Sequence, residues 1–109
     1  MDISGNCSKQ IAVSLSGRVY QELSIYAGTY ERMFNETYPY WVKNDTALWL
    51  DQTNGNWKIG SLNSLGSTRA NMYSEFLTLC PESLSVSWRS YYNLEWNEDY
   101  YNHINVTAV

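Results

Sequence analysis

The side chains best suited to chemistry in this chain are aromatic rings that also carry a hydrogen-bonding group. The 109 residues include 10 Tyr and 5 Trp, against 2 Phe and 1 His. A dry core needs only Phe, whereas Tyr and Trp keep one end able to hydrogen-bond, which suits a surface that recognises a wet and partly apolar ligand. The composition therefore favours binding over catalysis.

The segment 91–102, which reads YYNLEWNEDYYN, is the first candidate site, and a second aromatic group surrounds Pro39. In sugar recognition an aromatic ring stacks on the apolar face of a pyranose, while amides and carboxylates bond its hydroxyl groups. We therefore predict carbohydrate binding by this segment. The candidate ligand-binding residues are Tyr91, Tyr92, Asn93, Trp96, Asn97 and Tyr100 in the segment, and Tyr38, Tyr40 and Trp41 around Pro39.

The sequence leaves two other interpretations of this segment open. Adjacent tyrosines in a strand point to opposite faces, so one ring of each pair should be exposed unless the segment is a loop folded over the core. A solvated acidic loop with its rings held on the core is therefore the first alternative. In the second, Glu95, Glu98 and Asp99 supply oxygen ligands to Ca²⁺, although they lack EF-hand spacing. The sequence predicts no cofactor and leaves a calcium requirement open.

Catalytic motifs are absent from the sequence. His103 is the lone histidine and has no Ser-His or Cys-His motif around it, and neither a Gly-rich phosphate loop nor HExxH occurs. Carboxylate pairs such as Glu75 with Glu82 would indicate glycosidase chemistry only at a known separation in space. We expect that the protein is not an enzyme and that His103 lies at the surface near the last strand.

Charge and hydropathy exclude two classes of partner. The formal net charge is -4 and the pI is about 4.8, with the Lys and Arg residues scattered singly rather than clustered for phosphate binding. No apolar run approaches the ~18 residues that cross a membrane. We predict no nucleic-acid partner and no membrane insertion. The expected partner is a carbohydrate or glycoprotein, and self-association is left open.

Cys7 and Cys80 help to indicate the cellular compartment in which the protein folds. In an oxidising compartment they would close a loop spanning most of the domain, worth about 4 kcal/mol in the chain-entropy model, whereas in the cytosol they would be two buried thiols. A zinc site needs about four ligands, and Cys7, Cys80 and His103 supply only three. Because too few zinc ligands are present, the two cysteines favour a disulfide.

Further signals concern secretion. Residues 1–15 have no basic start, apolar core or cleavage site of a signal peptide, so the chain is either cytosolic or part of a longer secreted precursor. N-x-T sequons begin at Asn35, Asn44 and Asn105, and Asn6-Cys7-Ser8 fits the poorer form, although some such matches arise by chance. With the cysteines, they favour a secreted, extracellular location.

Short strands separated by turns are the elements expected to position these residues. Apolar side chains alternate in 11–15, 57–59, 86–90, 94–96 and 104–108, while 38–42 is an aromatic strand start and 47–50 a further predicted strand. A strand is predicted within Val19–Tyr30, with a short helix over Val19–Tyr26 as the alternative. Asn54-Gly55 predicts a hairpin turn, and 60–68 a Ser/Gly-rich loop. Residues 69–79 read as an irregular strand or one helical turn.

Together these elements predict an all-β fold, a single-domain antiparallel sandwich or barrel of about seven short strands over residues 1–109. Within it, Trp49 and Trp57 alternate with aliphatic neighbours and are expected in the core. The C-terminal strand is expected to pair into the sheet.

Several short motifs, taken in order, resemble a known kind of module. They are Val13-Ser14-x-Ser16-Gly17, Gly28-Thr29-Tyr30, Tyr38-Pro39-Tyr40, Leu48-Trp49-Leu50, Trp57-x-Ile59-Gly60, Cys80-Pro81, Trp88 and Trp96. The chain resembles an aromatic-rich extracellular module, often repeated in secreted multidomain proteins of marine invertebrates and protists, with the pattern VSG, GTY, PVY, LYY, WxIG, CP and two later Trp.

This resemblance implies an extracellular context and a Cys7–Cys80 bridge, and it attaches no activity. The chain departs from the pattern at Ser14-Leu15-Ser16-Gly17 and at Tyr40-Trp41, so a ligand shared with the module does not follow. We therefore predict an extracellular recognition module that binds glycans through exposed Tyr and Trp. The alternative is a structural or adhesive module that mediates protein–protein assembly in an extracellular matrix.

Overall fold

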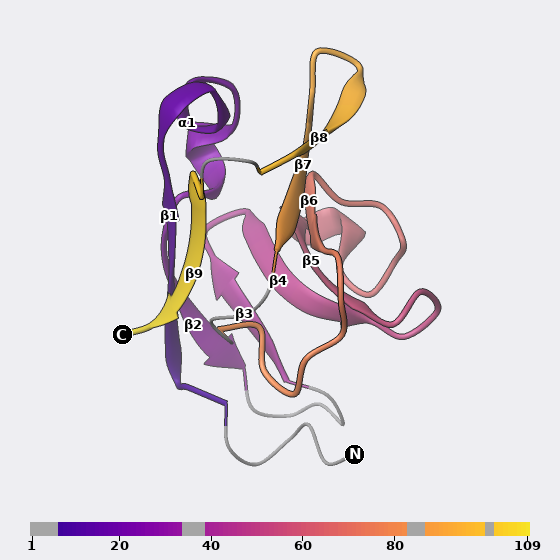
Figure 1. The fold of residues 1–109 in the computed structure, drawn as a ribbon. Coiled ribbons are helices and arrows are strands. Elements are labelled where there is room, and N and C mark those ends of the chain that lie inside the picture. The colour runs from indigo at the N-terminus through magenta and orange to yellow at the C-terminus, as the bar shows by residue number, and fades with distance from the viewer. Residues whose placement is uncertain (1–6, 34–38, 83–86, 100–101) are drawn as a thin grey trace.

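A computed structural model describes residues 7–33, 39–82, 87–99 and 102–109 (Figure 1). Within them, nine strands form one sheet in the order β8-β7-β6-β5-β4-β3-β2-β1-β9, which curls into a half-barrel. The strands are β1 Gln10–Leu15, β2 Gly28–Met33, β3 Tyr40–Lys43, β4 Thr46–Asp51, β5 Asn56–Ser61, β6 Met72–Ser74, β7 Trp88–Tyr92, β8 Glu95–Glu98 and β9 Ile104–Ala108. The helical elements are α1 Gly17–Leu23 and the 3₁₀ turns η1 Ser24–Tyr26 and η2 Leu62–Ser64.

The sheet is an antiparallel meander whose last strand returns to its first. Each strand from β1 to β8 pairs with the next in sequence, and β9 then pairs with β1, with Val106 opposite Val13. The prediction of an all-β fold with a paired C-terminal strand is confirmed. The strand count differs, because the sequence predicted about seven strands and the structure forms nine.

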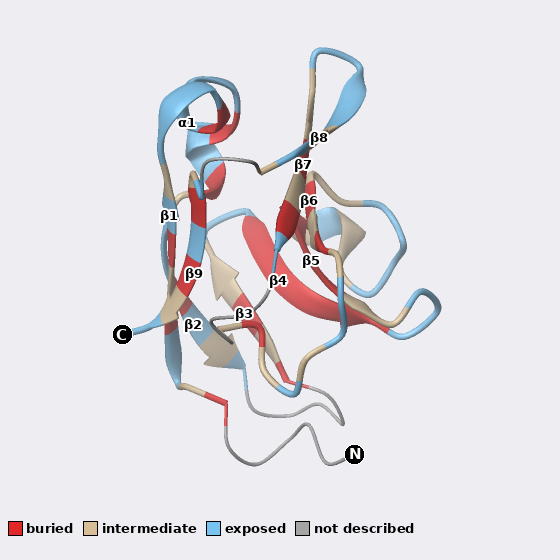
Figure 2. Ribbon diagram, in the orientation of Figure 1, coloured by how far each residue is buried: buried red, intermediate tan, exposed pale blue. Residues whose placement is uncertain are grey.

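Buried residues, red in Figure 2, occur along the sheet and in α1, and the core that they form includes the large aromatic rings of Trp41 and Trp57. Trp41 and Trp57 are both 0% exposed and meet edge to face, with ring centroids 5.9 Å apart. Trp49 is also buried, although it lies on the other face of β4, where the indole Nε1 donates to the Ser67 carbonyl at 3.1 Å. The prediction that Trp49 and Trp57 are buried is confirmed, although only Trp57 belongs to the main core cluster.

The strand predicted at the start of Val19–Tyr30 is wrong, and the helical alternative is right. Residues 17–23 form α1, and only Gly28 onward is strand. The buried residues of this stretch are Val19, Leu23 and Tyr26, which follow helical spacing, whereas Ile25 is 65% exposed. The burial of these residues therefore follows a helix rather than the two-residue period of a strand.

Tyr26 and Tyr30 connect this helical segment to the sheet through their hydroxyl groups. The Tyr30 hydroxyl donates to the Tyr26 carbonyl at 2.8 Å, and the Tyr26 hydroxyl donates to Asn71 Oδ1 at 2.8 Å. Burial raises the pKa of Tyr30 to about 12, so its hydroxyl remains a donor even in alkaline solution where an exposed tyrosine would ionise.

The predicted hairpin at Asn54-Gly55 joins β4 to β5. Gly55 adopts a φ of 71°, the left-handed conformation that glycine accepts without strain. The Asp51 carboxylate accepts from the amide of Thr53 at 2.9 Å and pairs with Lys58 Nζ at 3.2 Å. Asp51 and Lys58 each have a further hydrogen-bond partner besides one another. This buried ion pair therefore fixes the turn at the ends of its two strands, while Gly55 shapes its tip.

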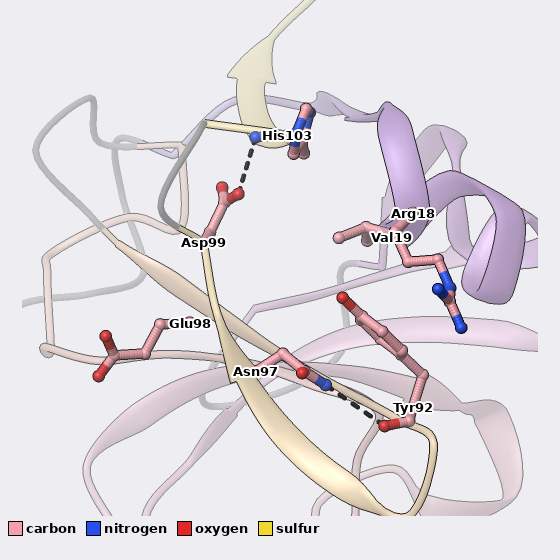
Figure 3. Close-up of a pocket in the computed structure, with 7 residues that line it drawn as sticks. All are labelled: Arg18, Val19, Tyr92, Asn97, Glu98, Asp99 and His103. Carbon is pink, nitrogen blue, oxygen red and sulfur yellow. Dashed lines mark hydrogen bonds between the residues drawn. The ribbon is translucent and has the colours of Figure 1, made fainter.

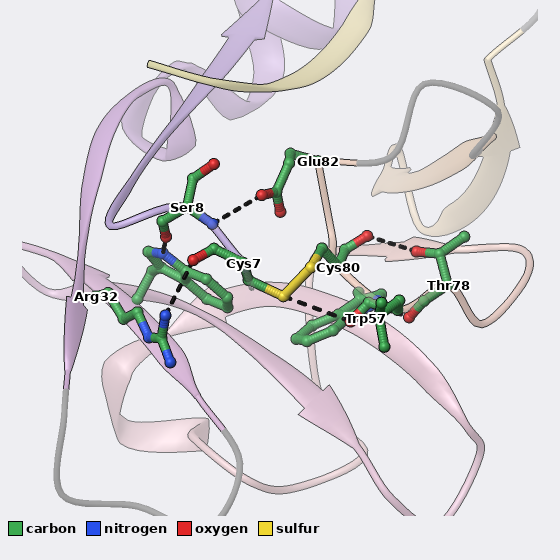
Figure 4. The surroundings of a disulfide bond; sticks show 9 residues. Cys7, Ser8, Arg32, Trp57, Thr78, Cys80 and Glu82 are labelled. Atoms are coloured by element: carbon green, nitrogen blue, oxygen red, sulfur yellow. Dashed lines mark hydrogen bonds between the residues drawn. A yellow bond between two sulfur atoms is a disulfide. The ribbon is translucent and has the colours of Figure 1, made fainter. Parts of the chain in front are cut away.

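The Cys7–Cys80 disulfide is present and ties the segment before β1 to the loop after β6 (Figure 4). Side chains of the sheet hold the chain at Cys7 and Ser8: Arg32 Nη1 donates to the Cys7 carbonyl at 2.9 Å, and Trp41 Nε1 donates to the Ser8 carbonyl at 2.8 Å. The predicted pairing of the two cysteines is thus confirmed.

Candidate functional site

The hairpin β7–β8 carries most of the predicted ligand-binding residues, and it presents them on two faces. Its two-residue turn is Asn93-Leu94, with φ values of 54° and 64°, as a type I′ hairpin requires. Tyr91 is paired with Trp96, and both lie on the outer face of the sheet. Tyr92 points the opposite way, as alternation in a strand demands.

Three rings on the outer face form a group that we call the outer aromatic cluster: Tyr73 on β6, Tyr91 on β7 and Trp96 on β8. The Trp96 ring meets Tyr73 and Tyr91 edge to face, with centroids 4.7 Å and 5.3 Å away. Trp96 remains 41% exposed. The two tyrosines thus hold an indole in one orientation at the surface, which lowers the entropy that it would lose on binding a ligand.

Charged side chains lie directly beside this cluster. Arg89 Nε donates to Glu75 Oε1 at 2.8 Å, and Arg89 Nη2 donates to Glu98 Oε1 at 2.6 Å. The hydrogen bond to Glu75 is the main cause that raises the pKa of Arg89. Each carboxylate keeps further acceptor positions, so the surface beside the rings can accept hydrogen bonds from hydroxyl groups.

The inner side of the same hairpin lines a cavity of about 370 Å³, which we call the α1 pocket (Figure 3). The Tyr92 ring forms one wall, and its hydroxyl points into the space near Val19. The Arg18 guanidinium carbon lies 5.9 Å from the centroid of the Tyr92 ring. The lining residues are Arg18, Val19, Tyr92, Asn97, Glu98, Asp99 and His103.

Asp99 and His103 shape the far wall of the α1 pocket. The Asp99 carboxylate accepts from the backbone amides of His103 and Ile104, at 2.8 Å and 2.9 Å. His103 Nδ1 lies 2.8 Å from Ser16 Oγ in a hydrogen bond. In a Ser-His-Asp triad the aspartate accepts from Nδ1 and the serine faces Nε2, so this arrangement differs from the catalytic one.

Gly17 fixes the approach of α1 to His103, and its replacement by alanine tests that contact. Its φ is 60°, and an added Cβ would lie 2.9 Å from Cε1 of the His103 ring. We expect Gly17→Ala to lower the free energy of unfolding by about 1–2 kcal/mol for the backbone conformation alone. It should also displace the imidazole, which NMR can follow as a single signal because the chain has 1 His.

Gly55→Ala is the matched control for this prediction. Gly55 also has a positive φ, and no described atom lies within 4 Å of its added Cβ, so the variant carries the backbone strain without the contact. Urea unfolding should therefore show a larger loss for Gly17→Ala than for Gly55→Ala. An unshifted His103 signal in Gly17→Ala would contradict the close approach.

The group around Pro39 does not form an exposed site in the described structure. Trp41 is 0% exposed within the core, so its prediction as a ligand-binding residue is corrected: the curvature of the sheet turns this face of β3 inward. Tyr40 is half-buried on β3. Tyr38 and Tyr100 lie outside the described residues.

The three carboxylates considered for calcium have different surroundings. Glu98 is bonded to Arg89 on the outer face, and Asp99 accepts from backbone amides beside the α1 pocket. Glu95 is exposed beside the hairpin turn, directly opposite Tyr92. Glu98 and Asp99 thus share the lining of the α1 pocket but have different hydrogen-bond partners, while Glu95 is not among the lining residues.

Reasoning from the sequence missed Tyr73 and Arg89 on the outer face and Arg18 beside the α1 pocket. Tyr73 lies in the stretch 69–79, whose pattern did not choose between strand and helix, and it enters the outer aromatic cluster because β6 pairs with β7. Arg18 lies between the strand predicted at 11–15 and the one predicted within Val19–Tyr30, and no role was predicted for it. The helical spacing of Val19, Leu23 and Tyr26 was the available signal for the helix that carries it.

No protein-family model, curated protein or solved structure matches the chain. The resemblance to an aromatic-rich extracellular module therefore stays a prediction. No helix in the described part of the chain has the length and apolar character needed to cross a membrane.

Proposed function

We propose that this chain is an extracellular recognition module that binds carbohydrate on the outer face of β6, β7 and β8. The single observation that carries the proposal is the outer aromatic cluster, in which Trp96 is 41% exposed and held edge to face by Tyr73 and Tyr91. The disulfide supports an oxidising compartment.

The chemistry of this face suits a sugar with many hydroxyl groups. An exposed indole offers an apolar surface to the C–H groups of a pyranose ring. Beside it, Glu75 and Glu98 accept hydrogen bonds, and Arg89 donates them. Because two carboxylates outnumber the one guanidinium, these groups carry a net negative charge, and the face favours neutral glycans over polyanionic ones.

Trp96→Ala tests the proposal on a glycan array. We expect the affinity for the bound glycan to fall about 30-fold, which corresponds to about 2 kcal/mol and is typical of an aromatic hot spot. The variant should remain folded and lose only about 1 kcal/mol of stability. Trp96 is partly exposed, so the substitution removes mainly its ring contacts with Tyr73 and Tyr91.

Tyr20→Ala is the matched control, because Tyr20 is 51% exposed and lies on α1, outside the outer aromatic cluster. It should leave glycan binding unchanged. The site assignment is wrong if Trp96→Ala binds as well as the wild type, or if Tyr20→Ala weakens binding equally.

Assembly between protein copies is a second candidate function, favoured by a separate observation. The loop after β6 exposes three apolar side chains: Phe76 is 65% exposed, Leu77 43% and Leu79 41%. Exposed apolar groups of this kind often mark contact surfaces. Light scattering over a concentration series decides between the two candidates. If the protein assembles, its mass should rise with concentration in the absence of sugar. The mass of Phe76→Ser should not rise.

A further inference from the structure

We propose that Asn105 is a site of N-glycosylation and that its oligosaccharide covers the open edge of β9. The inference rests on the proposed extracellular location, because the modification occurs on secreted chains. Asn105-Val106-Thr107 is an N-x-T sequon, and it lies wholly within β9.

The fold leaves the side chain of Asn105 accessible. The burial of β9 alternates: Ile104 and Val106 are buried, and Asn105 between them is exposed. Across the ladder Asn105 faces Ser14, which is also exposed, and Thr107 faces Ala12. The neighbours on this face are small, so bulky side chains on β1 do not crowd the Asn105 amide.

The attachment is compatible with the contact that Asn105 makes in the fold. In the transfer, a bond forms between Asn105 Nδ2 and C1 of an oligosaccharide. The bond from C1 to a lipid diphosphate breaks, the lipid diphosphate leaves with the electron pair, and Nδ2 loses one proton. The other Nδ2 hydrogen remains, and in the structure Nδ2 donates a hydrogen bond to the Asn102 carbonyl at 2.9 Å.

The position of Asn105 gives the oligosaccharide a physical role. β9 lies at one end of the strand order and, among the described residues, pairs with β1 alone (Figure 1). Its sequence, INVTA, has high β propensity and holds neither a charge nor a proline, the usual devices that keep an edge from pairing with another chain. The opposite edge strand, β8, instead carries Glu95 and Glu98.

The sequon at Asn44 offers a contrast. Asn44 is exposed in the turn between β3 and β4, with a φ of 53°. Both of these strands are paired on each side. An oligosaccharide on Asn44 therefore has no unpaired edge to cover, and the edge role belongs to Asn105.

Secretion of the chain from eukaryotic cells behind an added signal peptide tests the modification. Intact masses are compared for the wild type, Asn105→Gln and Thr107→Ala, with Asn44→Gln as the matched control. We expect Asn105→Gln and Thr107→Ala each to lose the mass of one and the same oligosaccharide, while Asn44→Gln keeps it. Equal masses for the wild type and Asn105→Gln would overturn the site.

The edge role has its own test, the oligomeric state of the secreted proteins by light scattering. Thr107→Ala removes the oligosaccharide and bares the edge, so its fraction of dimers and larger species should rise. Thr107→Lys also removes the sequon but places a charge on β9, so it should stay monomeric like the wild type. If Thr107→Ala is as monomeric as the wild type, the edge role is overturned.

These outcomes are separate from the proposed carbohydrate binding. The glycan array is run on unmodified protein made in bacteria and reports on Trp96, whereas the mass measurement reports a covalent bond at Asn105. A blank array would overturn the proposed binding and leave the mass result intact.

Discussion

Trp57→Ala should lower the free energy of unfolding by about 3–5 kcal/mol, the usual loss when a buried Trp is cut to Ala. Trp57 is 0% exposed at the centre of the core and packs edge to face on Trp41. The indole Nε1 also donates to the Thr78 carbonyl at 2.9 Å. The variant thus loses ring packing and a hydrogen bond together. Since domains of this size are typically stable by about 5–15 kcal/mol, much of the total would be lost.

Denaturant unfolding followed by circular dichroism measures this effect, with Trp96→Ala as the matched control. Both variants replace an indole by a methyl group, but Trp96 is 41% exposed. We expect the midpoint to fall far more for Trp57→Ala. Equal losses of stability would mean that Trp96 is a structural residue, and the site assignment would then be wrong.

Trp57→Phe separates the packing from the hydrogen bond. Phenylalanine keeps an aromatic ring against Trp41 and removes the donor to the Thr78 carbonyl. We expect a smaller loss than for Trp57→Ala, because most of the buried apolar area is retained.

Removal of the disulfide, in a Cys7→Ala/Cys80→Ala double variant, should lower the stability by about 4 kcal/mol. The bond joins residues 73 positions apart, and a cross-link that closes so long a loop restricts the unfolded chain strongly. It also anchors the segment before β1, whose carbonyls accept from Arg32 and Trp41. The folded state of the variant therefore loses the cross-link that holds these contacts together.

Thermal unfolding with and without a reducing agent checks this prediction. The wild type should lose stability on reduction and approach the double variant, which should not respond to the reductant. A change below about 1 kcal/mol in the double variant would contradict a stabilising role for the bond.

The sequence by itself determined the class of the fold and several of its local features. Alternation of apolar residues is a local property of a strand, so β1 and β9 were predicted from their own residues, and β4 was predicted from a short run of apolar residues. The turn at Asn54-Gly55 was also predicted from its own residues, because glycine adopts without strain the positive φ that such a turn requires. The two cysteines admitted a single intramolecular pairing, and the structure contains it.

The tertiary structure alone decided which aromatic rings reach the surface. Trp41 and Trp96 are the same residue type, each next to a polar or aromatic neighbour, yet one is 0% and the other 41% exposed. Alternation places residues on two faces of a strand but does not say which face the sheet curves around. For this reason Trp41 was assigned wrongly to the site.

The grouping of the site residues was likewise beyond the sequence. Tyr73 meets Trp96 because β6, β7 and β8 pair in register. Ser16 meets His103, 87 positions away, because β9 returns to β1 and α1 follows directly. Patterns along the chain indicate which residues share a face of one element. Contacts between elements depend on the strand order and the curvature of the sheet, and these are determined by the packing of the whole core.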